Sequence, residues 1–202
     1  MKKIILILSM VISLMACGSG SSTTSTAEPT ATTETVTITN SVDFNTTKAD
    51  MSGYKWLYDS EPAFVEITLE ESVRMFSEGG SGILYYGYAG CPWCERAVPI
   101  LNSVAKELGV TIYYINVHAQ TTMEAYNELV TYIEDIFEVD STTGEKEFKV
   151  PEVIAVKNGE ITDHHLALVD GFKIESDESQ MDDSQKEELR TIYYNLIESA
   201  KD

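Results

Sequence analysis

Residues 83–94 have the sequence ILYYGYAGCPWC, and this stretch decides the fold. The apolar run 83–88 is typical of a buried strand. After Cys94, apolar residues recur at helical spacing up to Leu108, as expected for a helix with one buried face. Cys91 would then lie at the N-terminus of that helix, where backbone N–H groups and the helix dipole favour a thiolate, the reactive form of cysteine.

The first seventeen residues predict where this cysteine chemistry takes place. Lys2 and Lys3 precede an apolar run, 4–15, that suits the core of a signal peptide but is short for a membrane span. The run ends in Leu-Met-Ala before Cys17, which resembles the bacterial lipoprotein signal, with cleavage before the cysteine and lipid added to it. Residues 1–16 are therefore expected to be a signal peptide. An ordinary secretory signal with a chance cysteine, and a retained membrane anchor, are the alternatives.

The chain has three cysteines, and lipid on Cys17 would leave only Cys91 and Cys94. A lone pair with CxxC spacing outside the cytoplasm indicates redox use rather than a structural disulfide framework. We expect no cofactor other than a redox-active Cys91–Cys94 disulfide.

The composition predicts a tethered domain. Residues 17–52 are expected to form a tether because 20–35 are mostly Ser, Thr, Ala and Gly and have little apolar surface to bury. Apolar residues alternate weakly at 36–44, which allows a short strand packed on the domain. Residues 53–202 are sufficient for one domain with one core. The formal net charge of −19 argues against nucleic acid as a partner and against electrostatic binding to anionic lipid.

The order of elements predicts an α/β fold. Thr68 and Glu71 have the spacing of a capping box at the start of the first helix. The expected strands are 64–67, 83–88, 111–117, 151–156 and about 161–169, and the expected helices follow Thr68, start near Cys91 and cover 123–137 and 189–197. This pattern indicates a sheet with helices on both faces.

The strand leading into CPWC, the long helix behind it, and Val150-Pro151 before a Lys-Asn-Gly hairpin together resemble the thioredoxin superfamily over about 64–201. With its lipoprotein signal, the chain resembles thioredoxin-like lipoproteins of Gram-positive bacteria, a group that includes bacteriocin transport accessory proteins. The resemblance implies a thioredoxin-like fold, with a central mixed sheet flanked by helices and an extended helix and loop before a cis-proline.

The resemblance also implies roles for the CPWC residues. Cys91 is the exposed nucleophile, and Cys94 resolves the mixed disulfide. Pro92 suits the first turn of a helix. Trp93 either covers the disulfide or presents a flat apolar surface to an unfolded substrate, and we favour both roles over core packing.

Pro151 matches the family's cis-proline, whose loop faces the CxxC and leaves the backbone of Val150 free to pair with an extended substrate. A trans proline at the start of an edge strand is the alternative. One position departs from the family. Many thioredoxins carry a buried acid six residues before the first cysteine, where this chain has Tyr85, and a phenol with a pKa of about 10 is a poor base near neutrality. Glu95 is adjacent to Cys94 but is expected to point to solvent, so the proton-transfer group stays open. Arg96 is expected to add a little positive potential near the cysteines, against the acidic surface.

The expected function is that of an extracytoplasmic thiol–disulfide oxidoreductase, lipid-anchored at the cell membrane. Its partners would be thiols or disulfides of exported proteins or peptides and a membrane redox partner. The direction of electron flow is open. A non-catalytic accessory role in peptide (bacteriocin) export is the alternative. A zinc site is disfavoured because His164 and His165 would point to opposite faces of a strand and His118 has no paired ligand in the sequence.

Overall fold

The computed structural model describes residues 35–202, which lie within one compact unit. The expected signal peptide 1–16 and Cys17 lie outside the described residues. Within 35–202, no helix combines the length and apolar character that crossing a membrane requires.

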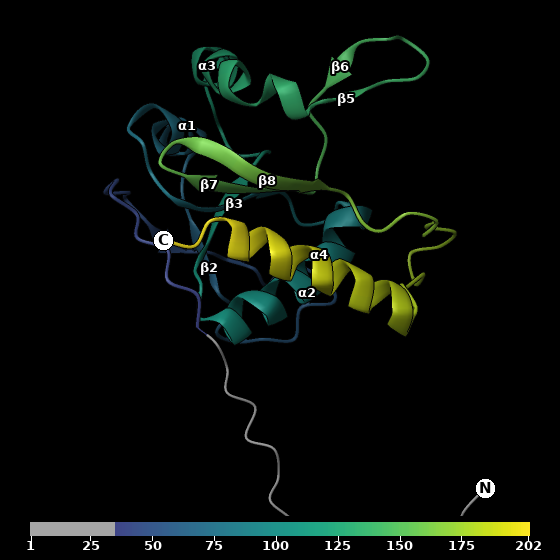
Figure 1. The fold of residues 1–202 in the computed structure, drawn as a ribbon. Helices are drawn as coiled ribbons and strands as arrows, with labels where there is room; N and C mark the ends of the chain where they lie inside the picture. The colour runs from purple at the N-terminus through teal and green to yellow at the C-terminus, as the bar shows by residue number, and fades with distance from the viewer. Residues whose placement is uncertain (1–34) are drawn as a thin grey trace, which may run out of the picture. The chain divides into compact units, whose positions relative to one another are not determined.

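The core of the fold is a mixed six-stranded sheet with the order β1-β2-β4-β3-β7-β8 (Figure 1). Its strands are β1 (Thr47–Lys48), β2 (Phe64–Glu66), β3 (Gly82–Gly87), β4 (Ile112–Asn116), β7 (Glu152–Lys157) and β8 (Glu160–Leu166). β2, β4 and β3 run parallel, whereas β1, β7 and β8 pair antiparallel with their neighbours. β3 lies inside the sheet and is completely buried, which explains its unbroken apolar sequence.

Within residues 35–202, four helices cover the two faces of the sheet. α2 (Pro92–Leu108) and α4 (Asp183–Ser199) lie together on one face, and α1 (Leu69–Ser77) and α3 (Met123–Ile133) lie on the other (Figure 1). The capping box of Thr68 and Glu71 is present at the start of α1, as predicted. α2 ends at Gly109, whose φ of 70° is the left-handed conformation that glycine adopts readily. The predicted thioredoxin-like fold is therefore confirmed, with a mixed sheet flanked by helices.

The long insertion before Pro151 also matches the prediction, with shorter elements than expected. α3 stops at Ile133 and continues as a 3₁₀ turn, η1 (Glu134–Ile136). A small hairpin follows, formed by β5 (Glu138–Val139) and β6 (Lys146–Glu147), and it extends beyond the sheet (Figure 1). The expected strand 161–169 ends earlier, at Leu166, because Ala167 takes a positive φ of 65° that breaks the extended backbone.

The domain begins earlier than the expected boundary at residue 53. Val36, Val42 and Phe44, from the weakly alternating segment, are buried. The Val36 N–H donates to the carbonyl of Leu108, and the Thr39 N–H and hydroxyl both donate to the carboxylate of Asp202. Residues 35–52 are therefore part of the domain.

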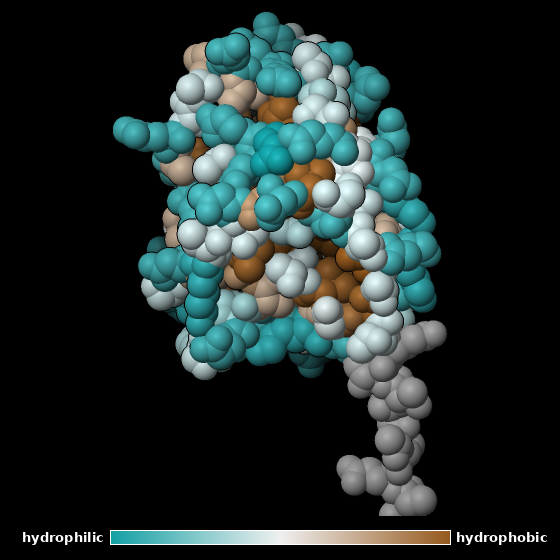
Figure 2. Space-filling view, turned by 90° about the vertical axis from the view of Figure 1, so that its left-hand side faces the viewer, coloured by the Kyte–Doolittle hydropathy of each residue, from teal (hydrophilic) through white to brown (hydrophobic). Residues whose placement is uncertain are grey.

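The side of the molecule that carries the C-terminus is mostly hydrophilic, with apolar side chains recessed between polar ones (Figure 2).

Candidate redox site at the N-terminus of helix α2

Cys91 is the N-cap residue of α2. Its Sγ accepts a hydrogen bond from the backbone N–H of Cys94 at 3.4 Å, so the sulfur occupies the position of a capping oxygen. Cys91 and Cys94 are both free thiols in this structure. The pKa of Cys91 is lowered to about 6, first by the hydrogen bond from the Cys94 thiol and then by the backbone N–H groups of Cys94 and Trp93. Burial and the charge of Glu95 act against this lowering. Near neutral pH, Cys91 is therefore mostly thiolate.

Cys94 lies one turn into α2 and is fully buried. Its pKa is raised because its thiol is hydrogen-bonded to the Cys91 sulfur, because burial disfavours its charge, and because the Cys91 thiolate repels a second negative charge. The two thiols thus share one proton, and the charge resides on Cys91, the sulfur nearer the surface.

The surroundings of the cysteine pair are more enclosed than the sequence predicted. Cys91 is only 5% exposed, so the expectation of an exposed sulfur is wrong for this structure. Trp93 is 37% exposed and meets the ring of Phe172 edge to face, with 6.4 Å between the centroids. Phe172 belongs to the segment between β8 and α4, and no sequence motif pointed to it.

The Val150-Pro151 bond is cis, as the resemblance implied. The carbonyl oxygen of Val150 lies 4.0 Å from Cys91 Sγ. Among residues 35–202, this is the only hydrogen-bond contact of the Val150 backbone. The fold therefore brings the proline loop and the cysteine pair together although almost sixty residues separate them in sequence.

Glu95 and Arg96 have different roles from those expected. Glu95 is buried rather than pointing to solvent, and its carboxylate accepts hydrogen bonds from the backbone N–H groups of Lys55 and Gly90. Arg96 is 4% exposed and its guanidinium donates to the carbonyl oxygens of Pro92, Ser176, Asp177 and Ser179. Both side chains hold loops around the site, and neither is available as a proton acceptor for Cys94.

The contacts of the three histidines are with groups other than the two cysteines. His164 lies 3.1 Å from the buried carboxylate of Glu152, His165 packs edge to face against Tyr193, and His118 stacks on Tyr88. In the part of the chain that the structure describes, no cluster of three His, Cys, Asp or Glu side chains is arranged to hold a metal ion.

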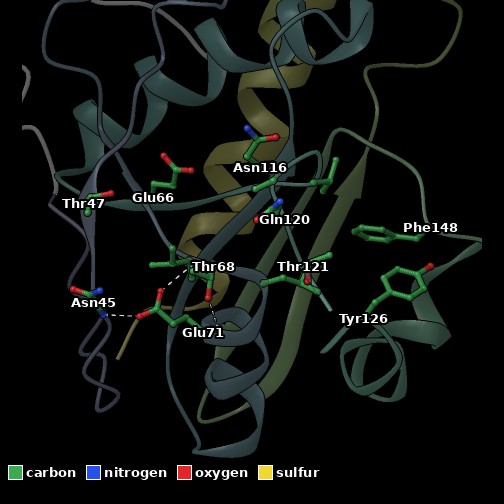
Figure 3. A pocket seen from close by; sticks show the side chains of 14 residues that line it. Asn45, Thr47, Glu66, Thr68, Glu71, Asn116, Gln120, Thr121, Tyr126 and Phe148 are labelled. Carbon is green, nitrogen blue, oxygen red and sulfur yellow. Dashed lines mark hydrogen bonds between the residues drawn. The ribbon is translucent and has the colours of Figure 1, made fainter. Parts of the chain in front are cut away.

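A separate pocket lies between the β2–α1 and β4–α3 connections (Figure 3). It has a volume of about 280 Å³ and contains no cysteine. Glu71, on one wall, already accepts hydrogen bonds from the N–H groups of Asn45 and Thr68, while Tyr126 and Phe148 form the opposite wall. This pocket is distinct from the cysteine site.

Comparison with known proteins finds similar solved structures. Thioredoxin O2 from Arabidopsis thaliana, in its oxidised state, aligns at a TM-score of 0.38 and 15% identity over 54% of this chain and 85% of that chain. No family model and no curated protein matches the sequence.

Proposed function

We propose that this protein is a thiol–disulfide oxidoreductase that acts on exported proteins or peptides through Cys91 and Cys94. The observation that carries the proposal is the position of the Cys91 sulfur as the N-cap acceptor of α2, with its pKa lowered to about 6. A thiolate at neutral pH is the form that attacks disulfides. A second thiol one turn away, still protonated, is the arrangement that resolution of a mixed disulfide requires.

The reaction proceeds in two exchanges. The Cys91 thiolate attacks one sulfur of a substrate disulfide, and the other substrate sulfur leaves as a thiolate and takes a proton from solvent. Cys94 then loses its proton to solvent and attacks the Cys91 sulfur, which releases the second substrate thiolate. Two electrons have moved to the substrate, and the protein holds a Cys91–Cys94 disulfide. The reverse sequence oxidises a substrate dithiol.

The substrate chain would dock between Trp93 and the Val150-Pro151 loop. Val150 offers a backbone carbonyl 4.0 Å from the reacting sulfur, and main-chain pairing suits varied substrates because it needs no particular side chain. Pro92 fixes the first turn of α2, and Trp93, two residues after Cys91, presents a partly exposed ring. Trp93→Ala should slow exchange with a disulfide-bonded protein more than exchange with a small disulfide reagent.

The location is part of the proposal. Cys17 would carry lipid and hold the domain at the extracytoplasmic face of the membrane, where a membrane-bound redox partner supplies or accepts electrons. Cys17→Ala should release the protein from the membrane fraction and block lipid attachment. A variant that stays membrane-bound and uncleaved would indicate a plain anchor instead.

Alkylation of the reduced protein across pH tests the redox function. Cys91 should react first, with half-maximal rate near pH 6, below the value of about 8.5 for a free cysteine. Cys94→Ser should accumulate mixed disulfides with exported proteins, and Cys91→Ser should not. Equal reactivity of both thiols with an ordinary pKa, together with a phenotype unaffected by either substitution, would favour the non-catalytic accessory role in peptide export.

The reduction potential of the Cys91–Cys94 pair decides the direction of electron flow. A value near about −120 mV would indicate an oxidant, and one near about −270 mV a reductant.

A further inference from the structure

The connection between β8 and α4, residues 167–182, leaves the sheet next to the proline loop (Figure 1). The N–H of Ala167 donates to the carbonyl of Pro151 at 2.8 Å, and the positive φ of Ala167 turns the chain out of the strand. Leu168 and Val169 are then buried in the core cluster that contains both cysteines. The start of this connection is therefore fixed beside the redox site.

The far part of the connection is fixed to the CPWC turn. The buried guanidinium of Arg96 donates to the carbonyl oxygens of Asp177 and Ser179 at 2.9 and 2.6 Å. It also donates to the carbonyl oxygen of Pro92 at 2.6 Å. Phe172 lies between the two fixed parts, so its backbone is held from both sides.

Phe172 and Trp93 form an aromatic corner. Their rings meet edge to face at 88°, with 6.4 Å between the centroids. Trp93 is 37% exposed, and Phe172 is partly buried against the cluster that contains the cysteines. Two perpendicular rings at the surface present an apolar angle that a third apolar side chain can fill.

The chain around this corner is acidic. Residues 170–178 contain Asp170, Glu175, Asp177 and Glu178, all of them exposed, and one lysine. Lys55 pairs with Glu178 at 2.5 Å and offsets one of these charges. A peptide with basic side chains is the partner that such a surface attracts.

We propose that Phe172 is a substrate-binding residue that, together with Trp93, receives a large apolar side chain next to the reacting cysteine of a basic peptide. This inference rests on the proposed redox function and deepens it by naming the class of substrate. Main-chain pairing at Val150 selects no side chain, whereas an aromatic corner does. Docking adds no chemical step, because neither ring exchanges electrons or protons with the substrate.

Exchange with three matched peptides tests the assignment. Each peptide has one cysteine and is used as its disulfide-linked dimer, so that its two sulfurs are equivalent. The first carries Phe next to the cysteine and Lys at the outer positions, the second has Ser in place of Phe, and the third has Glu in place of Lys. Hydroxyethyl disulfide is the small reagent. Every rate of the reduced full-length protein is divided by the rate of N-acetylcysteine with the same disulfide. If the reduction potential favours the reverse reaction, the oxidised protein is mixed with the reduced peptides and the same ratios are measured.

The wild type should favour the Phe peptide over the Ser peptide by about ten-fold, as expected for one side chain held between aromatic rings. Phe172→Ala should reduce this preference to about two-fold and change the rate with hydroxyethyl disulfide by less than about two-fold. Phe172→Tyr keeps the ring and should keep the preference. The Glu peptide should react more slowly than the Lys peptide, and added salt should reduce that difference.

Tyr132→Ala is the matched control, because Tyr132 in α3 is also 37% exposed and stacks on another ring, that of Phe76. It should change none of the ratios. If Phe172→Ala does not fold, Phe172→Leu keeps the apolar volume and should lower the preference by a smaller factor. A wild type that does not distinguish Phe from Ser, or a preference unchanged in these two Phe172 variants, would overturn the inference. Equal rates with the Lys and Glu peptides at low salt would overturn the basic character of the substrate. No exchange with any disulfide, the small reagent included, would instead refute the proposed redox function.

Discussion

Tyr85 and Tyr86 are neighbours in β3 and both are fully buried, but they face opposite layers of the molecule. Tyr85 belongs to the core cluster of α2 and α4, which also contains Cys94, whereas Tyr86 packs with α1 and α3 and meets Phe148 edge to face. The two layers bury similar apolar side chains. They differ in their polar groups, because the layer of Tyr85 holds two thiols and directs a backbone N–H towards the Cys91 sulfur. Packing therefore sets the stability of both layers, and polar placement sets the chemistry of one.

Truncation of a core leucine in each layer should give the largest effects. Leu101 in α2 and Leu129 in α3 are both fully buried. Leu101→Ala and Leu129→Ala should each lower the free energy of unfolding by about 2–5 kcal/mol, measured by urea denaturation. Leu129→Ala should leave the alkylation pKa of Cys91 unchanged, because Leu129 belongs to the other layer. A clear shift of that pKa in Leu129→Ala would show that the two layers are coupled.

One arginine from each layer, Arg96 in α2 and Arg74 in α1, extends the comparison, and the two differ in burial. Arg96 is buried and donates to carbonyls of the segment 176–179, whereas Arg74 in α1 pairs with Glu78 at a largely exposed site. Arg96→Met should cost about 2–3 kcal/mol, because it removes several charge-assisted hydrogen bonds made by a buried guanidinium. Arg74→Met should cost about 0.5 kcal/mol.

Urea denaturation measures both costs, and hydrogen exchange measures the loosening of 176–179 in Arg96→Met. Equal costs for the two substitutions would show that the guanidinium of Arg96 is replaceable by water.

Local pattern explains what the sequence could predict. Features that depend on neighbouring residues were predicted and confirmed. They are the strand 83–88, the capping box at Thr68, the helix start at Cys91 and the cis-proline before β7. The contacts of Arg96, and of Tyr54 whose hydroxyl lies 3.2 Å from that of Tyr85, depend on partners far along the chain. The carbonyls that hold Arg96 lie about eighty residues away, and Tyr54 lies in a segment with no regular pattern. No periodicity of the sequence reports such contacts.

The two helix caps should differ in their response to pH. Cys91 caps α2 and Thr68 caps α1. In the reduced protein, Cys91→Ala and Thr68→Ala should each cost about 1 kcal/mol at pH 8, and Cys91→Ser should recover most of the loss at its position. The pKa of Cys91 is lowered in the folded protein to about 6, so its stabilisation is present above the ordinary value of about 8.5 and is lost as the pH falls through about 6.

Thermal unfolding in reducing buffer from pH 5 to pH 9 measures both costs. The cost of Cys91→Ala should shrink as the pH falls, and that of Thr68→Ala should not. A cost of Cys91→Ala that stays constant over this range would mean that the thiolate does not cap the helix.

The smallest effects should come from the two adjacent histidines of β8, which belong to different layers. The carboxylate of Glu152 raises the pKa of His164, mainly through their hydrogen bond, whereas burial lowers the pKa of His165. A raised pKa in the folded state gives stability that is complete below about pH 6.5 and is lost as the pH rises through the folded value. A lowered pKa gives stability that is present above about pH 6.5 and is lost as the pH falls. The two histidines should therefore contribute with opposite pH dependence.

Urea denaturation of His164→Gln and His165→Gln between pH 5 and pH 8 tests this opposition. The cost of His164→Gln should be larger at pH 5.5 than at pH 8, and the cost of His165→Gln should be larger at pH 8 than at pH 5.5. Glu152→Gln serves as the control, because it removes the charge that His164 faces and should flatten the pH dependence at His164 without affecting His165. Parallel pH dependence of the two histidine variants would contradict the assignment of these residues to different electrostatic environments.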